Sequence, residues 1–226
     1  MTKKVSALFM LFGILFNAAL LVSNILAVKI ISVGGITATA GLLVFPLTYI
    51  LNDCIAEVWG FKKARFIIWT GFATNFIAVS FYQLAVILPA ADFWESQDAF
   101  SAILSQTPRI AVASLLAFLV GSFLNAYVMS RMKIASAGRN FSLRAIVSTL
   151  IGEGADSLIF FLIAFAWILP FPEIGLMIVT QTILKSAYEV IILPVTTRVV
   201  KYVKRVENVD VFDSNISYNV LKVKEI

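Results

Sequence analysis

Six long apolar stretches constrain the fold of this chain more than any other feature of its sequence. A helix needs about 20 residues to cross a hydrocarbon layer roughly 30 Å thick, and each stretch is at least that long. The segments between them are too short to form an extramembrane domain. We therefore predict an all-α membrane protein with six transmembrane helices in one bundle. The predicted spans are Val5–Ile31, Thr39–Gly60, Ala64–Leu88, Ile110–Lys133, Arg144–Leu169 and Ile174–Val200.

The composition agrees with a membrane protein and excludes several functions. Of the 226 residues, 60% are apolar and 14% are charged, and the mean hydropathy is +0.94. Soluble domains average about 45–50% apolar and about 25% charged residues, so this apolar surplus does not fit one small water-soluble core. The absence of histidine excludes His-ligated zinc and the Ser–His and Cys–His classes of catalysis. We expect no cofactor, no metal and no enzymatic activity.

The basic residues predict how the spans are oriented. Fifteen of the 18 Lys and Arg residues precede span one, join spans two and three, join spans four and five, or follow span six. Because cytoplasmic loops are enriched in Lys and Arg, we predict that both termini are cytoplasmic and that the net charge of +5 reflects orientation and not a nucleic-acid partner. The two triplets of spans would have to be inverted halves if they are related at all. We expect a transmembrane domain over residues 1–203 and a flexible cytoplasmic tail over residues 204–226.

Ionisable residues lie within the predicted spans, where they are costly. At mid-membrane an ionisable side chain costs about 2.5–3.5 kcal/mol on the insertion scale. Residues three or four apart share a helix face, and the polar residues of each span follow this spacing. Six helices that each carry one polar stripe predict a bundle around a polar interior. The ionisable residues at depth are Asp53, Glu57, Glu153, Asp156, Lys185 and Glu189.

These residues also have structural explanations. Glu57 lies near the basic residues that follow span two, so interfacial ion pairing would account for it. Lys185 and Glu189 have the i, i+4 spacing of an intrahelical pair, and asparagines within spans commonly hydrogen-bond one helix to another. Glu153 and Asp156 are the hardest to explain in this way, because no basic residue lies close to them in their span. Close carboxylates in a medium of low dielectric tend to share one proton.

The chemistry of these groups indicates a class of ligand. A carboxylate offers two acceptors that match adjacent N–H donors, such as those on the lactam edge of a guanine-like ring. Tyr49 and Tyr188 could stack on a planar ring, although packing within the core is the simpler explanation. A carboxyl pair could also carry a proton for coupled transport. The polar interior is therefore predicted to be an acidic cavity, and the residues alone do not name its ligand.

Four segments resemble one known family. They are NDCIAEVWGFKKAR (Asn52–Arg65), RIAVAS (Arg109–Ser114), GEGADSLIFFLIAF (Gly152–Phe165) and the Lys185–Glu189 stretch before Pro194. Together they resemble the queuosine precursor transporters, formerly described as vitamin uptake transporters, over roughly Ser23 to Pro194. The resemblance implies a multi-pass protein of the bacterial inner membrane that imports 7-deazaguanine derivatives such as 7-cyano-7-deazaguanine. It places Asp53, Glu57, Arg65, Arg109, Glu153, Asp156 and Lys185 at motif positions.

The resemblance and the polar stripes together predict a deazapurine site between the helices near mid-membrane. Asp156, assisted by Glu153, would accept the N–H groups of the lactam and amino groups. Lys185 or an asparagine amide would donate to the ring carbonyl. A coupling proton or ion and a homodimer are further expectations. The other residues of the predicted substrate site are Asn24, Tyr49, Asp53, Asn75, Tyr188 and Glu189.

Three other classes of function stay open on sequence grounds. The six-helix plan also resembles the substrate-binding subunits of energy-coupling-factor importers, which bind a small vitamin-like molecule and need a separate energising module. That similarity of fold does not carry function. An intramembrane enzyme is disfavoured, because the chain lacks histidine and GEGAD is not the GxGD motif of aspartyl membrane proteases. A channel or structural role would be distinguished from a carrier by conductance in planar bilayers.

Overall fold

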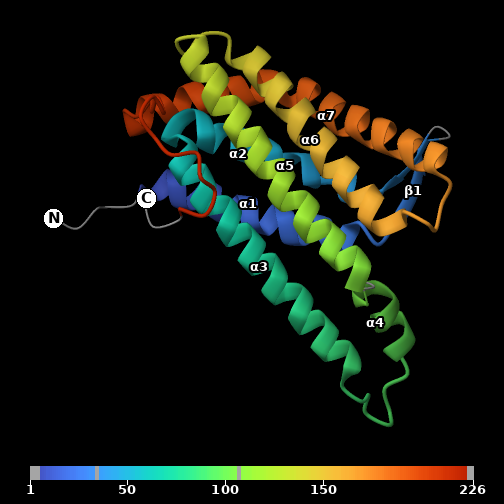
Figure 1. The fold of residues 1–226 in the computed structure, drawn as a ribbon. Coiled ribbons are helices and arrows are strands. Elements are labelled where there is room, and N and C mark those ends of the chain that lie inside the picture. Colours follow the sequence, from blue (N-terminus) through green and yellow to red (C-terminus); the bar gives the residue numbers. More distant parts are fainter. Residues whose placement is uncertain (1–5, 34–35, 106–107, 223–226) are drawn as a thin grey trace.

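The computed structural model describes residues 6–33, 36–105 and 108–222. Within these residues, six helical segments are long and apolar enough to cross a membrane, which confirms the predicted bundle. Figure 1 shows that α1 begins and α7 ends at the same end of this bundle. Its orientation in the membrane and the inversion of its halves stay predictions. The elements in chain order are α1 (Ala7–Leu26), β1 (Ile30–Val33), β2 (Ile36–Thr39), the 3-10 helix η1 (Ala40–Leu43), α2 (Phe45–Trp59), α3 (Phe61–Ile87), α4 (Gln97–Leu104), α5 (Pro108–Ala135), α6 (Phe141–Phe165) and α7 (Phe171–Glu207).

The ends of the observed helices differ from those of the predicted spans, for example in the first and last spans. α1 ends at Leu26 and does not continue to Ile31, because β1 and β2 pair as a short antiparallel hairpin. A short apolar run of this kind fits a helix or a strand equally well. α7 continues past Val200 to Glu207 and contains Pro194. Membrane helices tolerate such a proline where neighbouring groups satisfy the freed backbone carbonyl.

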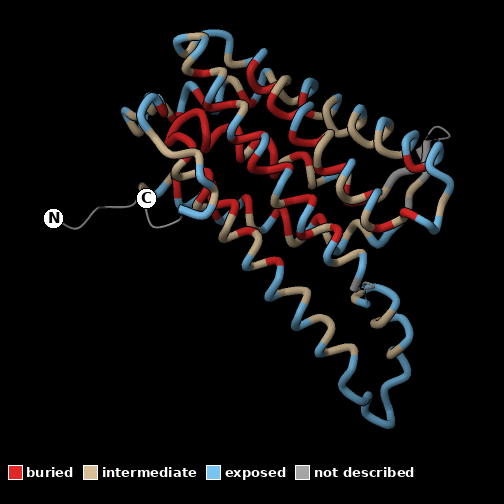
Figure 2. Tube along the Cα trace, in the orientation of Figure 1, coloured by how far each residue is buried: buried red, intermediate tan, exposed pale blue. Residues whose placement is uncertain are grey.

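α2 is the helix around which the others pack. It contacts α1, α3, α5, α6 and α7, and most of its side chains are buried. The outer faces of α3 and α7 stay exposed and apolar, with Phe81 65% and Ile191 75% exposed, as expected for faces in contact with lipid. Figure 2 shows burial fading along α3 toward α4. The central position of α2 places its polar residues inside the bundle.

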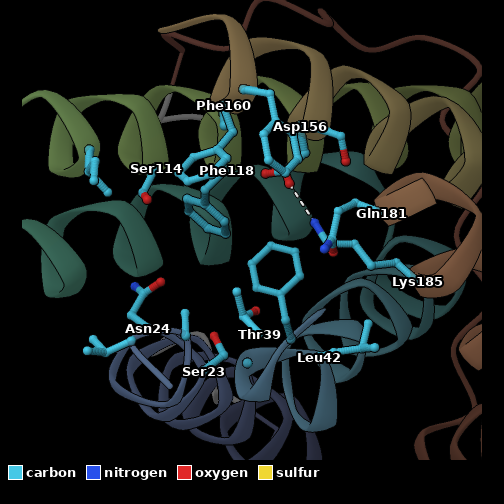
Figure 3. Close-up of a pocket in the computed structure, with 18 of the residues that line it drawn as sticks. Ser23, Asn24, Thr39, Leu42, Ser114, Phe118, Asp156, Phe160, Gln181 and Lys185 are labelled. Atoms are coloured by element: carbon cyan, nitrogen blue, oxygen red, sulfur yellow. Dashed lines mark hydrogen bonds and ion pairs between the residues drawn. The ribbon is translucent and has the colours of Figure 1, made fainter. Parts of the chain in front are cut away.

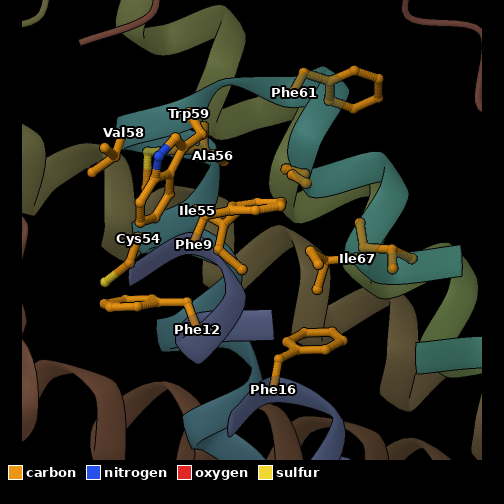
Figure 4. Packing of buried hydrophobic residues seen from close by; sticks show 14 of the residues in the cluster. Phe9, Phe12, Phe16, Cys54, Ile55, Ala56, Val58, Trp59, Phe61 and Ile67 are labelled. Carbon is orange, nitrogen blue, oxygen red and sulfur yellow. The ribbon is translucent and has the colours of Figure 1, made fainter. Parts of the chain in front are cut away.

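A hydrophobic core fills the half of the bundle where α1 begins. The ring of Trp59 contacts the rings of Phe9 and Phe12 edge-on, at centroid distances of 5.4 and 5.6 Å. Ile55 is fully buried in the same cluster, and Phe16 extends it along α1 (Figure 4). Because this half is filled by side chains, space for a ligand is left in the other half.

The described residues after α7, 208–222, pack against the bundle, which differs from the flexible tail that we predicted. Residues 223–226 of that predicted tail lie outside the described residues. Asp213 Oδ2 accepts hydrogen bonds from the Phe61 backbone N–H at 2.8 Å and from Ser130 Oγ at 2.6 Å. The indole N–H of Trp69 donates to the carbonyl of Val220 at 2.8 Å. Apolar tail residues also pack on the hydrophobic core. Their irregular spacing between polar residues predicts no regular element, and for this reason the sequence analysis missed them.

Gly152 of α6 allows α5 and α6 to approach closely. A Cβ atom on Gly152 would lie 2.8 Å from the Asn125 side chain and 2.9 Å from the carbonyl oxygen of Gly121. We expect Gly152→Ala to lower the free energy of unfolding by about 1–3 kcal/mol through overpacking, measured as a fall in melting temperature in detergent. Gly154→Ala is the matched control, because its Cβ would meet only one methyl group at 3.9 Å. Equal melting temperatures for the two variants would contradict the close packing at Gly152.

Candidate substrate site

A cavity of about 530 Å³ lies between the helices in the half of the bundle away from the hydrophobic core. This volume is in the range of small-molecule binding sites. The cavity is walled by the end of α1, the segment from Thr39 to Phe45, Asn75 of α3, the end of α4, the first half of α5, the second half of α6 and the first half of α7. Leu20 and Phe118 belong to both the cavity wall and the hydrophobic core, so the core forms the floor of the cavity.

One side of the cavity carries a charged cluster. Lys185 Nζ lies 2.9 Å from Glu153 Oε2 and 2.8 Å from Asp156 Oδ2. Glu153 is fully buried, whereas Asp156 and Lys185 line the cavity (Figure 3). The Lys185 ammonium group also lies 4.2 Å from the centre of the Phe45 ring, a cation–π contact. Lys185 therefore joins α7 to the two acids of α6, and the intrahelical pair with Glu189 that we considered is not formed.

The opposite side of the cavity carries two amides. Asn24 Nδ2 of α1 donates to Asn75 Oδ1 of α3 at 2.7 Å. This bond joins two helices, as the structural explanation of these asparagines requires. Both residues also line the cavity, and Figure 3 shows Asn24 and Ser23 across the cavity from Asp156. The interhelical bond and contact with a ligand are therefore compatible at this position.

The remaining predicted site residues are not among those that line the cavity. Tyr49 and Asp53 of α2 are buried, and Asp53 Oδ1 accepts hydrogen bonds from Asn125 Nδ2 at 2.8 Å and Ser148 Oγ at 3.3 Å. Glu189 is buried as well, whereas Tyr188 is partly exposed. The structure thus brings Asn24, Asn75, Asp156 and Lys185 to one cavity, holds Glu153 against it through Lys185, and places Tyr49, Asp53, Tyr188 and Glu189 outside its lining.

The cavity contains further residues that the sequence analysis missed. Gln181 precedes Lys185 and Phe160 follows Asp156 by one helical turn, so helical spacing was a usable signal for both. Phe118 gave no such signal, because an aromatic residue in a span faces lipid, core or ligand with the same sequence pattern. The serines that line the cavity gave no signal either, because serine is small enough to occur in any contact between helices. The missed lining residues that carry polar or aromatic groups include Ser23, Ser114, Phe118, Ser157, Phe160 and Gln181.

A buried ion network closes the bundle at the end where α7 finishes. The carboxylate of Glu57 forms ion pairs with Arg144 of α6 and, at 2.6 Å, with Lys204 of α7. Lys133 of α5 lies 3.9 Å from Glu57 Oε1 and also pairs with Asp210 in the tail. Partial burial raises the pKa of Asp210, but hydrogen bonds from Lys133 and Lys204 outweigh it and leave that pKa below its ordinary value. Glu57 is therefore ion-paired as considered above, and its partners Arg144, Lys204 and Lys133 come from three other helices.

Six apolar helices around a cavity fit one class of protein, and the family match shows it, a multi-pass membrane transporter of a small molecule. Residues 39–199 match the family described as "Putative vitamin uptake transporter". Because this match spans most of the chain, the protein belongs to that family. No solved structure matches the chain.

Relatives with a more specific name confirm the resemblance seen in the sequence. The chain is 32% identical over 174 residues to the "Probable queuosine precursor transporter" of Bacillus subtilis (strain 168), covering 76% of each chain. It is 31% identical over 165 residues to the "Queuosine precursor transporter" of Escherichia coli (strain K12), covering 73% of this chain and 71% of the relative. A relative from Haemophilus influenzae is 30% identical over 131 residues, 57% of this chain and 52% of its own. These relatives are named as transporters and not as enzymes.

Proposed function

We propose that this protein imports a 7-deazaguanine precursor of queuosine, such as 7-cyano-7-deazaguanine, across the bacterial inner membrane. The observation that carries the proposal is the position of Asp156, which borders the cavity and is paired with Lys185. The names of the relatives support the substrate class. With both termini in the cytoplasm, as the basic residues predict, the cavity lies toward the outer side of the membrane.

Asp156 and Lys185 together match the polar edge of a guanine-like ring. Among the described residues, Lys185 is the hydrogen-bond partner of the Asp156 carboxylate, through Oδ2, so acceptor capacity is left for a ligand. The lactam and exocyclic amino N–H groups of a deazaguanine are adjacent donors, which a carboxylate accepts in a bidentate manner. Lys185 has three N–H donors, one of which is available for the ring carbonyl next to the lactam N–H.

The rest of the cavity suits the body of the same ligand. Phe118 and Phe160 line it with flat apolar surfaces on which a bicyclic ring can stack. Asn24 and Asn75 supply amide groups on the side opposite Asp156, where they can bond a polar substituent at position 7. The proposed site therefore combines a charged edge for recognition, aromatic walls for the ring and amides for the substituent.

Import requires the closed end of the bundle to open while the cavity closes. The ion pairs of Glu57 join α2 to α6 and α7, so a separation of α2 from these helices breaks them together. Rocking of helices around a fixed site is the usual means of alternating access in secondary transporters. We propose that the Glu57 network is the inner gate of this movement.

Thermal stabilisation of the purified protein tests the substrate class. A ligand that binds only the folded state stabilises it by about 2.7 kcal/mol at 100 times its Kd. We expect 7-cyano-7-deazaguanine and its 7-aminomethyl counterpart to raise the melting temperature, and riboflavin and biotin to leave it unchanged. Ser114→Trp, which fills the cavity from α5, should remove the response. Val112→Trp is the matched control, because Val112 is 50% exposed on the same helix. A shift with a vitamin and none with the deazapurines would refute the proposed substrate class.

A further inference from the structure

We propose that Asp53 of α2 and Glu189 of α7 form a proton-binding site that couples substrate import to an inward movement of protons. The proposal rests on the import function proposed above. Neither acid lines the cavity, so contact with the substrate does not explain why they are buried inside the bundle. The proposal gives them a role. Each is at least 98% buried, since Asp53 is 0% and Glu189 2% exposed.

The two carboxyl groups lie side by side, close enough to share one proton. Asp53 Oδ1 accepts hydrogen bonds from the neutral donors Asn125 and Ser148. Among the described residues, Asp53 Oδ2 accepts no hydrogen bond. The carboxyl group of Glu189 interacts with the side chains of Asp53 and Thr149. Burying a carboxylate oxygen without a donor is costly, and a proton between the two groups removes that cost.

No cation pairs with either carboxyl group within the described part of the chain. Lys185 lies one turn before Glu189 but is held by the acids of α6. Two adjacent carboxyl groups without a counter-cation in low dielectric do not both ionise, so the pair holds at least one proton. The titratable groups that interact with the pair electrostatically include Tyr49, Cys54 and Glu153. Other titratable groups on the helices around it include Glu57 on α2, Lys133 on α5, Arg144 and Asp156 on α6, and Lys185, Tyr188 and Lys204 on α7.

The position of the pair connects the substrate cluster with the inner gate. On α7, Glu189 follows Lys185 by four residues, and on α2, Asp53 precedes Glu57 by four, which is about one helical turn in each case. A separation of α2 from α7 that opens the gate also separates the two carboxyl groups and admits water. The shared proton then leaves a carboxyl oxygen for water on the cytoplasmic side, and the empty pair takes up another from the cavity side after closure.

Proton movement is measured with purified protein in liposomes that contain a trapped pH-sensitive dye. When 7-cyano-7-deazaguanine is added outside, we expect its entry to acidify the interior. An imposed gradient of one pH unit, acid outside, should drive about tenfold accumulation of the substrate if one proton accompanies each molecule, because one unit corresponds to about 1.36 kcal/mol.

Two variants locate the coupling at this pair. Asp53→Asn and Glu189→Gln should each abolish the acidification and the response to the pH gradient. The Kd for the substrate should change by no more than about threefold, which is small because a tenfold change corresponds to about 1.4 kcal/mol. Glu173→Gln is the control, because Glu173 is an exposed acid in the first turn of the same helix. It should behave like the unmodified protein.

The outcomes separate this site from the import function. Substrate entry into wild-type liposomes without acidification, dependence on a sodium gradient in place of a proton gradient, or an unchanged gradient response in both variants would overturn the proton site and leave import intact. A wild-type protein that neither binds nor moves the deazapurine would instead refute the import function. If a variant does not fold, the dye measurement on the wild-type protein still shows whether protons enter together with the substrate.

Discussion

Replacing Asp156 by asparagine is expected to weaken the binding of 7-cyano-7-deazaguanine by roughly 100-fold or more, because hydrogen bonds to a charged acceptor contribute about 1.5–3 kcal/mol each. Asparagine keeps one acceptor but turns an amide N–H₂ toward a ring N–H, so one ring donor is left facing another donor. The substitution also leaves Lys185 with Glu153 as its one remaining ion-pair partner among the described residues. No other single change of similar size removes as much of the proposed recognition edge.

Isothermal titration of the purified protein in detergent measures this effect. Asp92→Asn is the control, because Asp92 is exposed in the loop between α3 and α4. It should leave the Kd unchanged. Glu153→Gln should have a smaller effect than Asp156→Asn, since Glu153 reaches the cavity only through Lys185. A Kd for Asp156→Asn close to that of the unmodified protein, at an equal melting temperature, would show that Asp156 does not bind the ligand.

Replacing Glu57 by glutamine is expected to lower the free energy of unfolding by about 3–5 kcal/mol, the cost of breaking a buried ion pair by removing one partner. Arg144 is 1% and Lys133 2% exposed. Without Glu57, the buried guanidinium of Arg144 has no carboxylate partner among the described residues. Lys133 and Lys204 still pair with Asp210 of the tail, so Arg144 is the main cation that loses its ion-pair partner.

Thermal unfolding in detergent measures this loss of stability. Glu95→Gln, in the exposed loop before α4, is the control and should unfold at the temperature of the unmodified protein. The double variant Glu57→Gln, Arg144→Met should recover part of the lost stability, because both members of the pair are removed together. A melting temperature of Glu57→Gln equal to that of the control, or a double variant in which the two losses simply add, would contradict a stabilising pair between α2 and α6.

Hydropathy and periodicity predicted the six helices and most of the polar interior because both patterns are local. The lengths of the apolar stretches set the spans, and the i, i+3 and i, i+4 spacing placed Glu153 and Asp156 on one face of α6. The same reasoning failed where two structures fit one pattern. The apolar residues after α1 fit a helix as well as the β1–β2 hairpin that they form, and the tail after α7 shows no period although it is packed.

Contacts between helices could not be predicted from the sequence. The spacing of Lys185 and Glu189 predicted a pair within α7, but the rotation of α7 against α6 turns Lys185 toward the acids of α6. Glu57 similarly pairs with Arg144 and Lys204, which are distant from it in the chain. Such partners depend on how helices pack, and a single sequence contains no direct record of that packing.

Entry of radiolabelled 7-cyano-7-deazaguanine into liposomes that contain this chain and no other protein is the most direct test of import. We predict saturable entry that Ser114→Trp abolishes and Val112→Trp leaves intact, because only the first substitution fills the cavity. Binding without entry would contradict import by the single chain and would match a substrate-binding subunit that needs an energising module. Equal entry with Ser114→Trp would show that the substrate does not pass through this cavity.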